Sequence, residues 1–320
     1  MVIFVVLPML LAVAFMTIAE RRLLAIMQRR QGPMEVGYYG VLQPFADALK
    51  LILKETVIPS LSNAILFYLA PVSTLILSLL GWAIIPFGQG LFIFDYSLGI
   101  LYTLALSSLG VYGILFAGWS ANSKYAFLGS LRSTSAMISY ELILSSAILI
   151  VIFLSGSLNF STIIEYQQAC WYIIPLLFVF IFYFIAILAE TSRTPFDLQE
   201  AESELVSGFM TEHSSVPFVF FFLGEYSSIV LFSCITAILF LAGYHVSEIF
   251  VNNSFVILQS VVLGLKTCLF CFLFILARAA LPRLRYDQLI EVCWLHLLPI
   301  CVALIIFVPS ILISFDALPN

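Results

Sequence analysis

The sequence predicts an all-α integral membrane protein with eight transmembrane helices and one short amphipathic helix at the membrane interface. Of the 320 residues, 62% are hydrophobic and only 10% are charged, against about 45–50% and about 25% in soluble domains. The mean hydropathy is +1.13. A soluble domain of this length cannot hide so much apolar surface from water. The chain therefore needs lipid around it.

Eight apolar stretches are long enough to cross a hydrocarbon core of ~30 Å, which requires about 20 residues per helix. They cover residues 2–19, 65–85, 98–119, 136–154, 171–189, 216–242, 255–277 and 292–313. The first stretch has neither a basic n-region nor a small-residue cleavage site, so we expect a transmembrane helix and not a signal peptide. Residues 1–320 are expected to form a single membrane domain.

The basic residues predict the orientation of these spans. Of the 13 Lys and Arg residues, all but Lys266 follow the first, third, fifth or seventh stretch, and Lys266 lies inside the seventh. Loops with an excess of Lys and Arg face the cytoplasm or the mitochondrial matrix. Because the number of spans is even, both termini are expected on the opposite side.

The first basic loop contains a segment, residues 43–56, that is too short to span a membrane. Its apolar side chains recur at helical spacing, at Phe45, Leu49, Ile52 and Leu53. Charged side chains occupy the other face of such a helix. We expect it to lie flat at the interface, where it either anchors the loop or borders an opening into the bilayer.

Residues 190–215 form an acidic segment on the side where the other loops are basic. Its carboxylates are Glu190, Asp197, Glu200, Glu202, Glu204 and Glu212. Pro195 disfavours a helix just before Asp197, and Asp197 with Glu200 fits an N-cap and its capping-box partner, so a short helix is expected from Asp197. Glu200 and Glu204 then share a face and repel each other, which favours a retained proton. The segment can pass protons, and the alternative is a solvated acidic loop.

Two more carboxylates, Glu141 and Glu225, lie within or at the edge of predicted spans. An ionised group at bilayer depth costs at least ~2.5–3.5 kcal/mol, so it is tolerated when it faces a hydrated interior, has a partner or takes up a proton. Proton or ion transfer is the first hypothesis for both. For Glu225 the alternative is a structural pairing, for example with Lys266 or Arg278.

Other site classes have little support in the sequence. The six cysteines lie mostly inside apolar runs, and the Cys268–Cys271 pair has no second Cys or His pair, so we expect thiols that pack between helices and no metal or iron–sulfur site. The basic residues form no stripe with interleaved aromatics, which excludes nucleic-acid binding.

Several segments together resemble one protein family. They read ERRLLAIMQ at 20–28, QGP at 31–33, YGVLQPFADALK at 39–50, GWSANSKYA at 118–126, ISYE at 138–141, AETSRTPFDL at 189–198, ESELVSG at 202–208, GEY at 224–226 and RYDQL at 285–289. The family is chain 1 of NADH:ubiquinone oxidoreductase, the respiratory complex I membrane subunit at the junction of the two arms. The resemblance runs from about residue 5 to 300. The chain departs from the family's pattern at two places and loses no carboxylate at either. It has Ala201 where the family often has Gly, and Met210-Thr-Glu-His213 where the family usually has Asn-Val-Glu-Tyr.

The resemblance implies a subunit that forms the membrane part of the ubiquinone tunnel and the start of a carboxylate path coupling quinone reduction to proton translocation. The implied proton path comprises Glu141, Glu190, Asp197, Glu200, Glu202, Glu204 and Glu225. The residues implied for the quinone tunnel and for charge tuning are Arg21, Arg22, Arg132, Arg193, Tyr226 and Arg278. The chain would belong to an H+-translocating NADH:ubiquinone reductase without holding a complete active site of its own.

The same resemblance implies the cofactors, partners and location. Ubiquinone is the expected substrate, while NADH, FMN and iron–sulfur clusters belong to partner subunits, in agreement with the lack here of a Gly-rich dinucleotide fingerprint. Expected partners are the other complex I membrane subunits and the peripheral-arm subunits that carry the quinone site and the clusters. The 30 phenylalanines and the family favour a mitochondrial inner membrane over a bacterial plasma membrane, with the basic loops on the matrix side and the termini in the intermembrane space.

Three alternatives remain at this point. The first is the related membrane subunit of an energy-converting hydrogenase. The second is a stand-alone ion transporter, which the lack of an inverted repeat disfavours. The third is a lipid-embedded anchor for peripheral subunits, which leaves Glu225 without a role.

Overall fold

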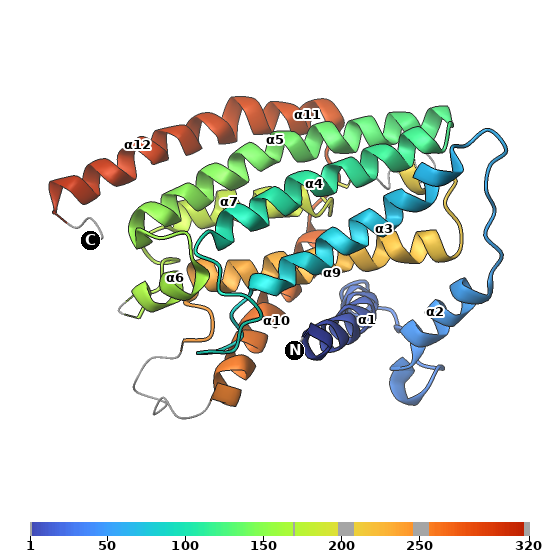
Figure 1. The fold of residues 1–320 in the computed structure, drawn as a ribbon, viewed down its shortest axis with the longest axis horizontal. Coiled ribbons are helices and arrows are strands. Elements are labelled where there is room, and N and C mark those ends of the chain that lie inside the picture. Colours follow the sequence, from blue (N-terminus) through green and yellow to red (C-terminus); the bar gives the residue numbers. More distant parts are fainter. Residues whose placement is uncertain (1, 169, 198–207, 246–255, 317–320) are drawn as a thin grey trace.

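Helices make up nearly all regular structure in the computed structural model, which describes residues 2–168, 170–197, 208–245 and 256–316 (Figure 1). The α-helices are α1 (Val2–Met27), α2 (Gln43–Leu53), α3 (Ala64–Leu80), α4 (Gly99–Ser120), α5 (Lys124–Ser155), α6 (Phe160–Tyr166), α7 (Leu177–Glu190), α9 (Val216–Phe240), α10 (Val256–Ala280), α11 (Tyr286–Glu291) and α12 (Leu298–Ser314). Shorter pieces are η1 (Tyr38–Gly40), η2 (Gly81–Ile84), η3 (Gly208–Met210) and the π-helical η4 (Val292–Leu297). Among the described residues the β-structure is a single isolated bridge, between Gly88 and Leu91. The all-α prediction is confirmed.

Six helical segments of the described chain are long and apolar enough to cross a membrane. They are Ala64–Ile84, Gly99–Ser120, Lys124–Ser155, Val216–Phe240, Leu258–Ala280 and Tyr286–Ser314. The remaining two predicted spans correspond to α1, with 26 residues, and to the shorter apolar α7, with 14. An integral membrane protein follows from these helices, and the count of eight spans stays a prediction.

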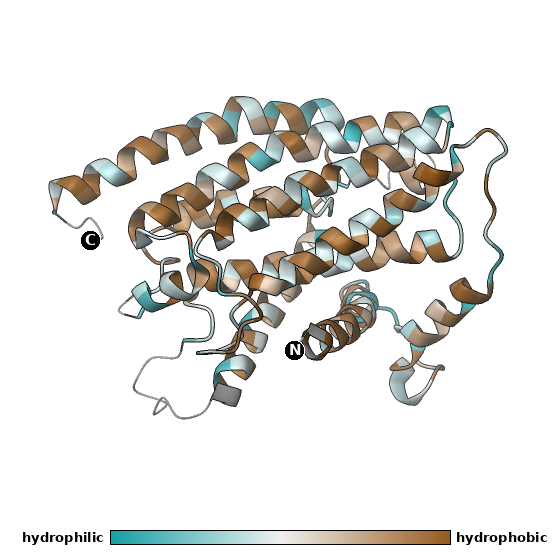
Figure 2. Ribbon diagram, in the orientation of Figure 1, coloured by the Kyte–Doolittle hydropathy of each residue, from teal (hydrophilic) through white to brown (hydrophobic). Residues whose placement is uncertain are grey.

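The helices pack as a bundle in which α3 contacts α4 and α9, α5 contacts α4, α7 and α12, and α9 also contacts α10. Apolar residues run along the helices, and hydrophilic residues gather toward helix ends and loops (Figure 2). The largest fully buried side chains include Tyr140 on α5, Tyr183 on α7 and Phe240 on α9. The core therefore sits where α5, α7 and α9 meet.

Two helices extend well beyond the apolar stretches that predict them. α1 continues to Met27. α5 begins at Lys124, because Ser123 caps this helix by accepting the Ala126 N–H at 3.3 Å. Hydropathy marks only the lipid-facing part of a helix, so polar turns at its ends escape notice. The hydropathy pattern places three arginines in connecting loops, but they lie in helices: Arg21 and Arg22 in α1 and Arg132 in α5.

Lys266 is the one basic residue that does not follow an odd-numbered apolar stretch, and its side chain caps the C-terminus of α9. Its Nζ donates hydrogen bonds to the carbonyl oxygens of Leu241, Gly243 and His245 at 2.6, 2.7 and 3.0 Å. These oxygens lie at and beyond the C-terminus of α9, where main-chain acceptors lack helical partners and a cation is favourable.

Candidate functional site

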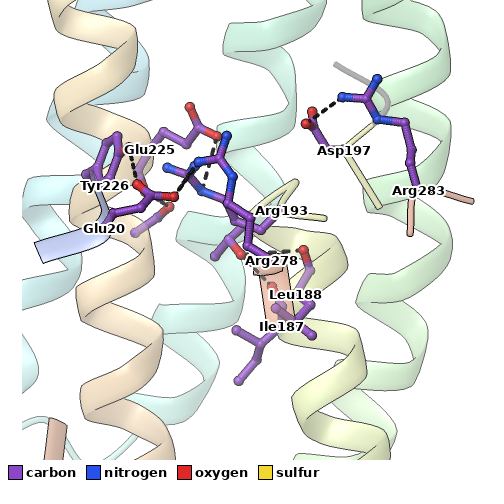
Figure 3. A network of polar contacts seen from close by, with 11 residues as sticks. Glu20, Ile187, Leu188, Arg193, Asp197, Glu225, Tyr226, Arg278 and Arg283 are labelled. Carbon is purple, nitrogen blue, oxygen red and sulfur yellow. Dashed lines mark hydrogen bonds and ion pairs between the residues drawn. The ribbon is translucent and has the colours of Figure 1, made fainter. Parts of the chain in front are cut away.

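The candidate site is a set of five polar side chains held between α1, α9, α10 and the segment after α7. We call Glu20, Arg193, Glu225, Tyr226 and Arg278 the charge cluster (Figure 3). Glu20 lies on α1, Glu225 and Tyr226 on α9, and Arg278 in the last turn of α10. The cluster joins residues up to 258 positions apart in sequence.

Glu20 is the centre of the charge cluster. Arg193 Nη1 lies 3.4 Å from its Oε1, Arg278 Nη1 donates to the same oxygen, and the Tyr226 hydroxyl donates to its Oε2 at 2.5 Å. Arg193 also reaches the second acid, with Nε 3.9 Å from Glu225 Oε1, and its guanidinium carbon lies 4.4 Å from the centre of the Tyr226 ring. One guanidinium thus links both carboxylates and an aromatic face.

The end of α7 places Arg193 in the cluster. The main-chain N–H groups of Ser192 and Arg193 turn back to donate to the carbonyls of Ala189 and Leu188 at 3.1 and 3.0 Å. Ser192 adopts a left-handed conformation with φ of 51°, which short polar side chains tolerate. The chain therefore folds back under the helix and directs the Arg193 side chain toward α1 and α9 (Figure 3).

The cluster is largely buried, with Arg278 its most exposed side chain at 31%, so its charges depend on one another. The side chains of Glu20 and Arg193 are 7% and 9% exposed, and that of Glu225 is 14% exposed. Burial acts to lower the pKa of Arg193, but Glu225, Tyr226 and Glu20 outweigh it and raise that pKa above its ordinary value. The guanidinium stays charged, because removing either sign would leave the other uncompensated in a poorly hydrated place.

A second ion pair holds the start of the acidic segment. Arg283 Nη2 lies 2.8 Å from Asp197 Oδ2, and the Leu284 N–H donates to the Pro195 carbonyl at 3.0 Å. Both contacts tie the chain after α7 to the loop between α10 and α11, and Figure 3 shows the ion pair between Asp197 and Arg283. The helix expected from Asp197 falls on residues outside those described, as do Glu200, Glu202 and Glu204.

The structure brings together some of the predicted site residues and separates others. Arg193, Glu225, Tyr226 and Arg278 meet in the charge cluster. Arg21 lies outside the cluster and pairs with Asp47 of α2 at 2.7 Å, and both residues line the same cavity as Tyr226. Glu141, Arg22 and Arg132 are half-buried at other positions, Glu141 in the middle of α5.

Two residues of this region are missing from the predicted site, Glu20 and Arg283. Glu20 stands at the end of the first apolar stretch directly before two arginines, and that position is the signal that could have found it. In the structure Glu225 pairs with Arg193, whereas Arg278 pairs with Glu20 and Lys266 donates to carbonyl oxygens.

Two cavities adjoin these residues. The first, which we call the central cavity, measures about 130 Å³, lies between α3, α4 and α9, and is lined by Glu190 and Glu225. The second, which we call the α2 cavity, measures about 350 Å³ and lies between α1, α2 and α9, with Tyr226 on its wall. Carboxylates that face a cavity beside fixed cations can exchange protons with water or with a bound molecule. Among the described residues, no group of three His, Cys, Asp or Glu side chains could hold a metal ion.

His213 lies close to the site, in the turn before α9. Its ring stacks on Phe67 with 4.0 Å between centroids and meets Phe221 edge-on at 5.1 Å. Burial lowers the pKa of His213 from 6.5 to about 4. The imidazole is therefore neutral at pH 7.

This lowered pKa predicts an acid-sensitive contribution to stability. Between pH 6.5 and about 4 the unfolded chain binds the proton that folded His213 rejects, so stability falls as the pH drops through this window. In His213→Phe, which keeps the aromatic stack, the melting temperature of the assembled protein should fall less between pH 7 and pH 5 than in the wild type. Equal pH dependence in the two proteins would contradict the assignment.

The fold and the site together define a multi-helix membrane protein with a buried ion-pair cluster beside two cavities. The family model described as NADH dehydrogenase matches residues 1–309. The chain therefore belongs to the NADH dehydrogenase family, and the resemblance found in its motifs is confirmed.

Named relatives match the chain over almost its whole length. It is 64% identical to NADH-ubiquinone oxidoreductase chain 1 of Mycosarcoma maydis over 317 residues, which cover 98% of this chain and 96% of the relative. It is 50% identical to the chain of the same name from Yarrowia lipolytica, covering 97% and 95%. It is also 50% identical to a subunit of the NADH-quinone oxidoreductase of Rhodospirillum centenum, covering 98% and 93%.

Proposed function

We propose that this chain is the core membrane subunit of a proton-pumping NADH:ubiquinone oxidoreductase, in which it forms the membrane part of the ubiquinone tunnel and the start of the carboxylate proton path. The family and the names of the relatives support a membrane subunit of respiratory complex I. They favour this assignment over a hydrogenase subunit or a stand-alone transporter, which would move ions as a purified single chain.

Membership of complex I also implies the substrate, the cofactors, the partner subunits and the membrane. Ubiquinone is the substrate, and NADH, FMN and the iron–sulfur clusters belong to partner subunits. The chain contributes to the enzyme alongside other membrane subunits and the peripheral arm. Fungal and algal relatives and the apolar helices support a multi-pass protein of the mitochondrial inner membrane. The charge pattern supports the basic loops on the matrix side and the termini in the intermembrane space.

The α2 cavity is the observation that carries the tunnel proposal. Phe218 and Phe222 of α9 contribute aromatic walls suited to a quinone ring and an apolar tail, and Tyr226 connects the cavity to the charge cluster. The apolar face of α2 is exposed, with Leu49 59% and Leu53 82% accessible, as a helix lying on lipid requires. A quinone arriving from the bilayer would therefore pass beneath α2 toward the charges.

The carboxylates around the central cavity support the proton path. Glu190 and Glu225 line the same cavity, and Arg193 links Glu225 to Glu20. When quinone is reduced and protonated nearby, the charge balance of the acidic segment changes, and displaced protons move along Glu190, Glu141 and Glu225. Moving one charge against the membrane potential costs ~2.3 kcal/mol per 100 mV, so a shift of about two pKa units per site is the required size.

Filling the α2 cavity tests the tunnel. Ala48 lines this cavity, whereas its neighbour Leu49 is exposed on the same helix. In assembled complex I, Ala48→Trp should raise the KM for ubiquinone about tenfold, equivalent to ~1.4 kcal/mol of binding free energy, because the indole occupies the path. Electron transfer from NADH to an acceptor that bypasses quinone should not change.

Leu49→Trp is the matched control for this experiment, since it adds a larger side chain to α2 outside the cavity. Its KM for ubiquinone should equal that of the wild type. An unchanged KM in fully assembled Ala48→Trp would refute the entry route beneath α2.

A further inference from the structure

A third cavity lies where the start of α3, the end of α4 and the start of α5 come together (Figure 1). It measures about 420 Å³, and we call it the interfacial cavity. No residue of the charge cluster lines it. Five of its eight lining residues belong to the segment GWSANSKYA at 118–126. This motif takes no part in the proposed function, so the cavity that it builds needs an explanation of its own.

The interfacial cavity lies at the level where the chain enters and leaves the membrane. Three of the segments that are long enough to span a membrane begin or end beside it, at Ala64, Ser120 and Lys124. Trp119 lines the cavity and is 54% exposed, and tryptophan is enriched at the depth of the lipid headgroups. A molecule in the cavity would therefore share the space of the headgroups.

Hydrogen bonds hold the walls of the interfacial cavity in place. The Asn63 N–H donates to the Ser120 carbonyl at 3.1 Å, and Asn122 Nδ2 donates to the Leu61 carbonyl at 3.1 Å. Both bonds tie the chain before α3 to the end of α4 and the turn that follows it. Because the walls are fixed by the protein itself, a ligand would lose little affinity to ordering them.

The lining of the interfacial cavity suits an anion. Lys124 supplies an ammonium group and forms no ion pair with a described residue. Ser123 Oγ accepts the Ala126 N–H at 3.3 Å, so its own hydroxyl proton can be donated to a ligand. Asn122 has a second amide N–H besides the one given to Leu61. No Asp or Glu is among the described residues that line the cavity.

Exposed apolar side chains continue from the interfacial cavity into the bilayer. On α4, Tyr112 and Leu101 stand seven and 18 residues before Trp119, which places all three on one face of the helix, and each is exposed. On α5, Phe127 lines the cavity, and Leu131 is exposed one turn further along. A free phosphate would leave these faces unused, whereas the acyl chains of a lipid would cover them.

We propose that the interfacial cavity binds the headgroup of an anionic phospholipid. Lys124 neutralises the phosphate, Ser123 and Asn122 donate hydrogen bonds to its oxygens, and the acyl chains follow the exposed face of α4. Basic pockets between transmembrane helices are typical of sites for anionic headgroups. A choline or ethanolamine cation would find no carboxylate among the described lining residues, so the site should prefer phosphatidylglycerol to phosphatidylcholine. This binding is independent of the roles proposed for the α2 cavity and for the carboxylates.

Photolabelling of assembled complex I tests the site. The enzyme is placed in phosphatidylcholine vesicles that contain a small share of phosphatidylglycerol with a photoactivatable headgroup, or the same share of phosphatidylcholine with the same reactive group. Mass spectrometry then locates the label. Peptides that contain residues 119–127 should be labelled by the phosphatidylglycerol probe and much less by the phosphatidylcholine probe. Equal labelling by the two probes, or none at these residues, would overturn the proposal.

Substitutions of Lys124 test the charge. Lys124→Gln should lower labelling of residues 119–127 about fivefold, since one lysine near the surface contributes ~1 kcal/mol to the binding of anionic lipid. Lys124→Arg should retain the labelling. Lys54→Gln is the matched control, because Lys54 is also an exposed lysine but does not line the cavity. All three residues of the test are exposed or replaced conservatively, so the complex should assemble, which native gels verify. Wild-type labelling in Lys124→Gln would contradict the site.

Two further measurements distinguish a lipid from other occupants of the interfacial cavity. An excess of glycerol 3-phosphate should not displace the label, and full displacement would show a site for soluble phosphates instead. A carbodiimide, which couples lysine to carboxylates, should not join Lys124 to another subunit, and such a cross-link would show that a protein covers the cavity. Either result would reject the lipid site and leave the proposed function intact, since neither quinone reduction nor proton pumping is measured.

Discussion

Replacing Arg193 by Gln is expected to destabilise the chain by about 3–5 kcal/mol, the cost of removing one partner from a buried ion pair. The substitution removes the guanidinium beside Glu225 and leaves Glu20 with one arginine, Arg278, in side chains that are 14% and 7% exposed. Proteins are stable by only about 5–15 kcal/mol, so much of the margin disappears. The amount of assembled complex I on native gels and its melting temperature should both fall.

Arg30→Gln provides the control for this experiment. Arg30 is an exposed arginine whose described hydrogen bond is to the nearby Gln28 side chain, and exposed substitutions change stability by about 0.5 kcal/mol or less. Assembly and melting temperature should match the wild type. If Arg193→Gln behaved in the same way, the charge cluster would not stabilise the subunit.

Replacing Glu190 by Gln is expected to lower coupled ubiquinone reduction by about 10²-fold or more, the size of effect found for a lost proton-transfer group. The amide has nearly the shape of the carboxyl group, and the buried Oε2 has no described hydrogen-bond partner to lose. Folding and assembly should therefore persist. The measurements are the NADH:ubiquinone rate and proton uptake in vesicles, with electron transfer to a bypass acceptor as the measure of intact complex.

Glu165→Gln is the matched control for Glu190→Gln. Glu165 is an exposed carboxylate on α6, at the end of the bundle remote from the charge cluster. Its replacement changes the net charge by the same amount but should leave coupled activity unchanged. Wild-type pumping in fully assembled Glu190→Gln would remove this residue from the proton path.

Much of the fold could be predicted because the bilayer dictates helix length. The apolar stretch at 98–119 corresponds to α4 (Gly99–Ser120), and that at 216–242 to α9 (Val216–Phe240). The polar beginning of α5 and the end of α1 escaped prediction, since hydropathy does not register helical turns that extend beyond lipid. The sequence alone does not distinguish Ser123, which caps α5, from the many other serines of the chain.

The members of the charge cluster could be found more readily than their pairing. An ionised carboxylate at bilayer depth costs free energy, so Glu225 could be identified as a candidate from the sequence alone. Which cation neutralises it depends on how α7 ends and on where α1 crosses α9, and both are tertiary features. Glu20 illustrates the limit, because its contacts with Arg193, Tyr226 and Arg278 come from three distant parts of the chain.

Lys266 bears on how topology is inferred for chains of this kind. An ammonium group has three N–H donors, and here three main-chain oxygens engage Nζ at 2.6–3.0 Å. A cation saturated in this way has little capacity left to attract phospholipid headgroups or to resist translocation. An intramembrane lysine that is internally solvated by peptide groups should accordingly be omitted when charges are weighed to orient a multispanning chain.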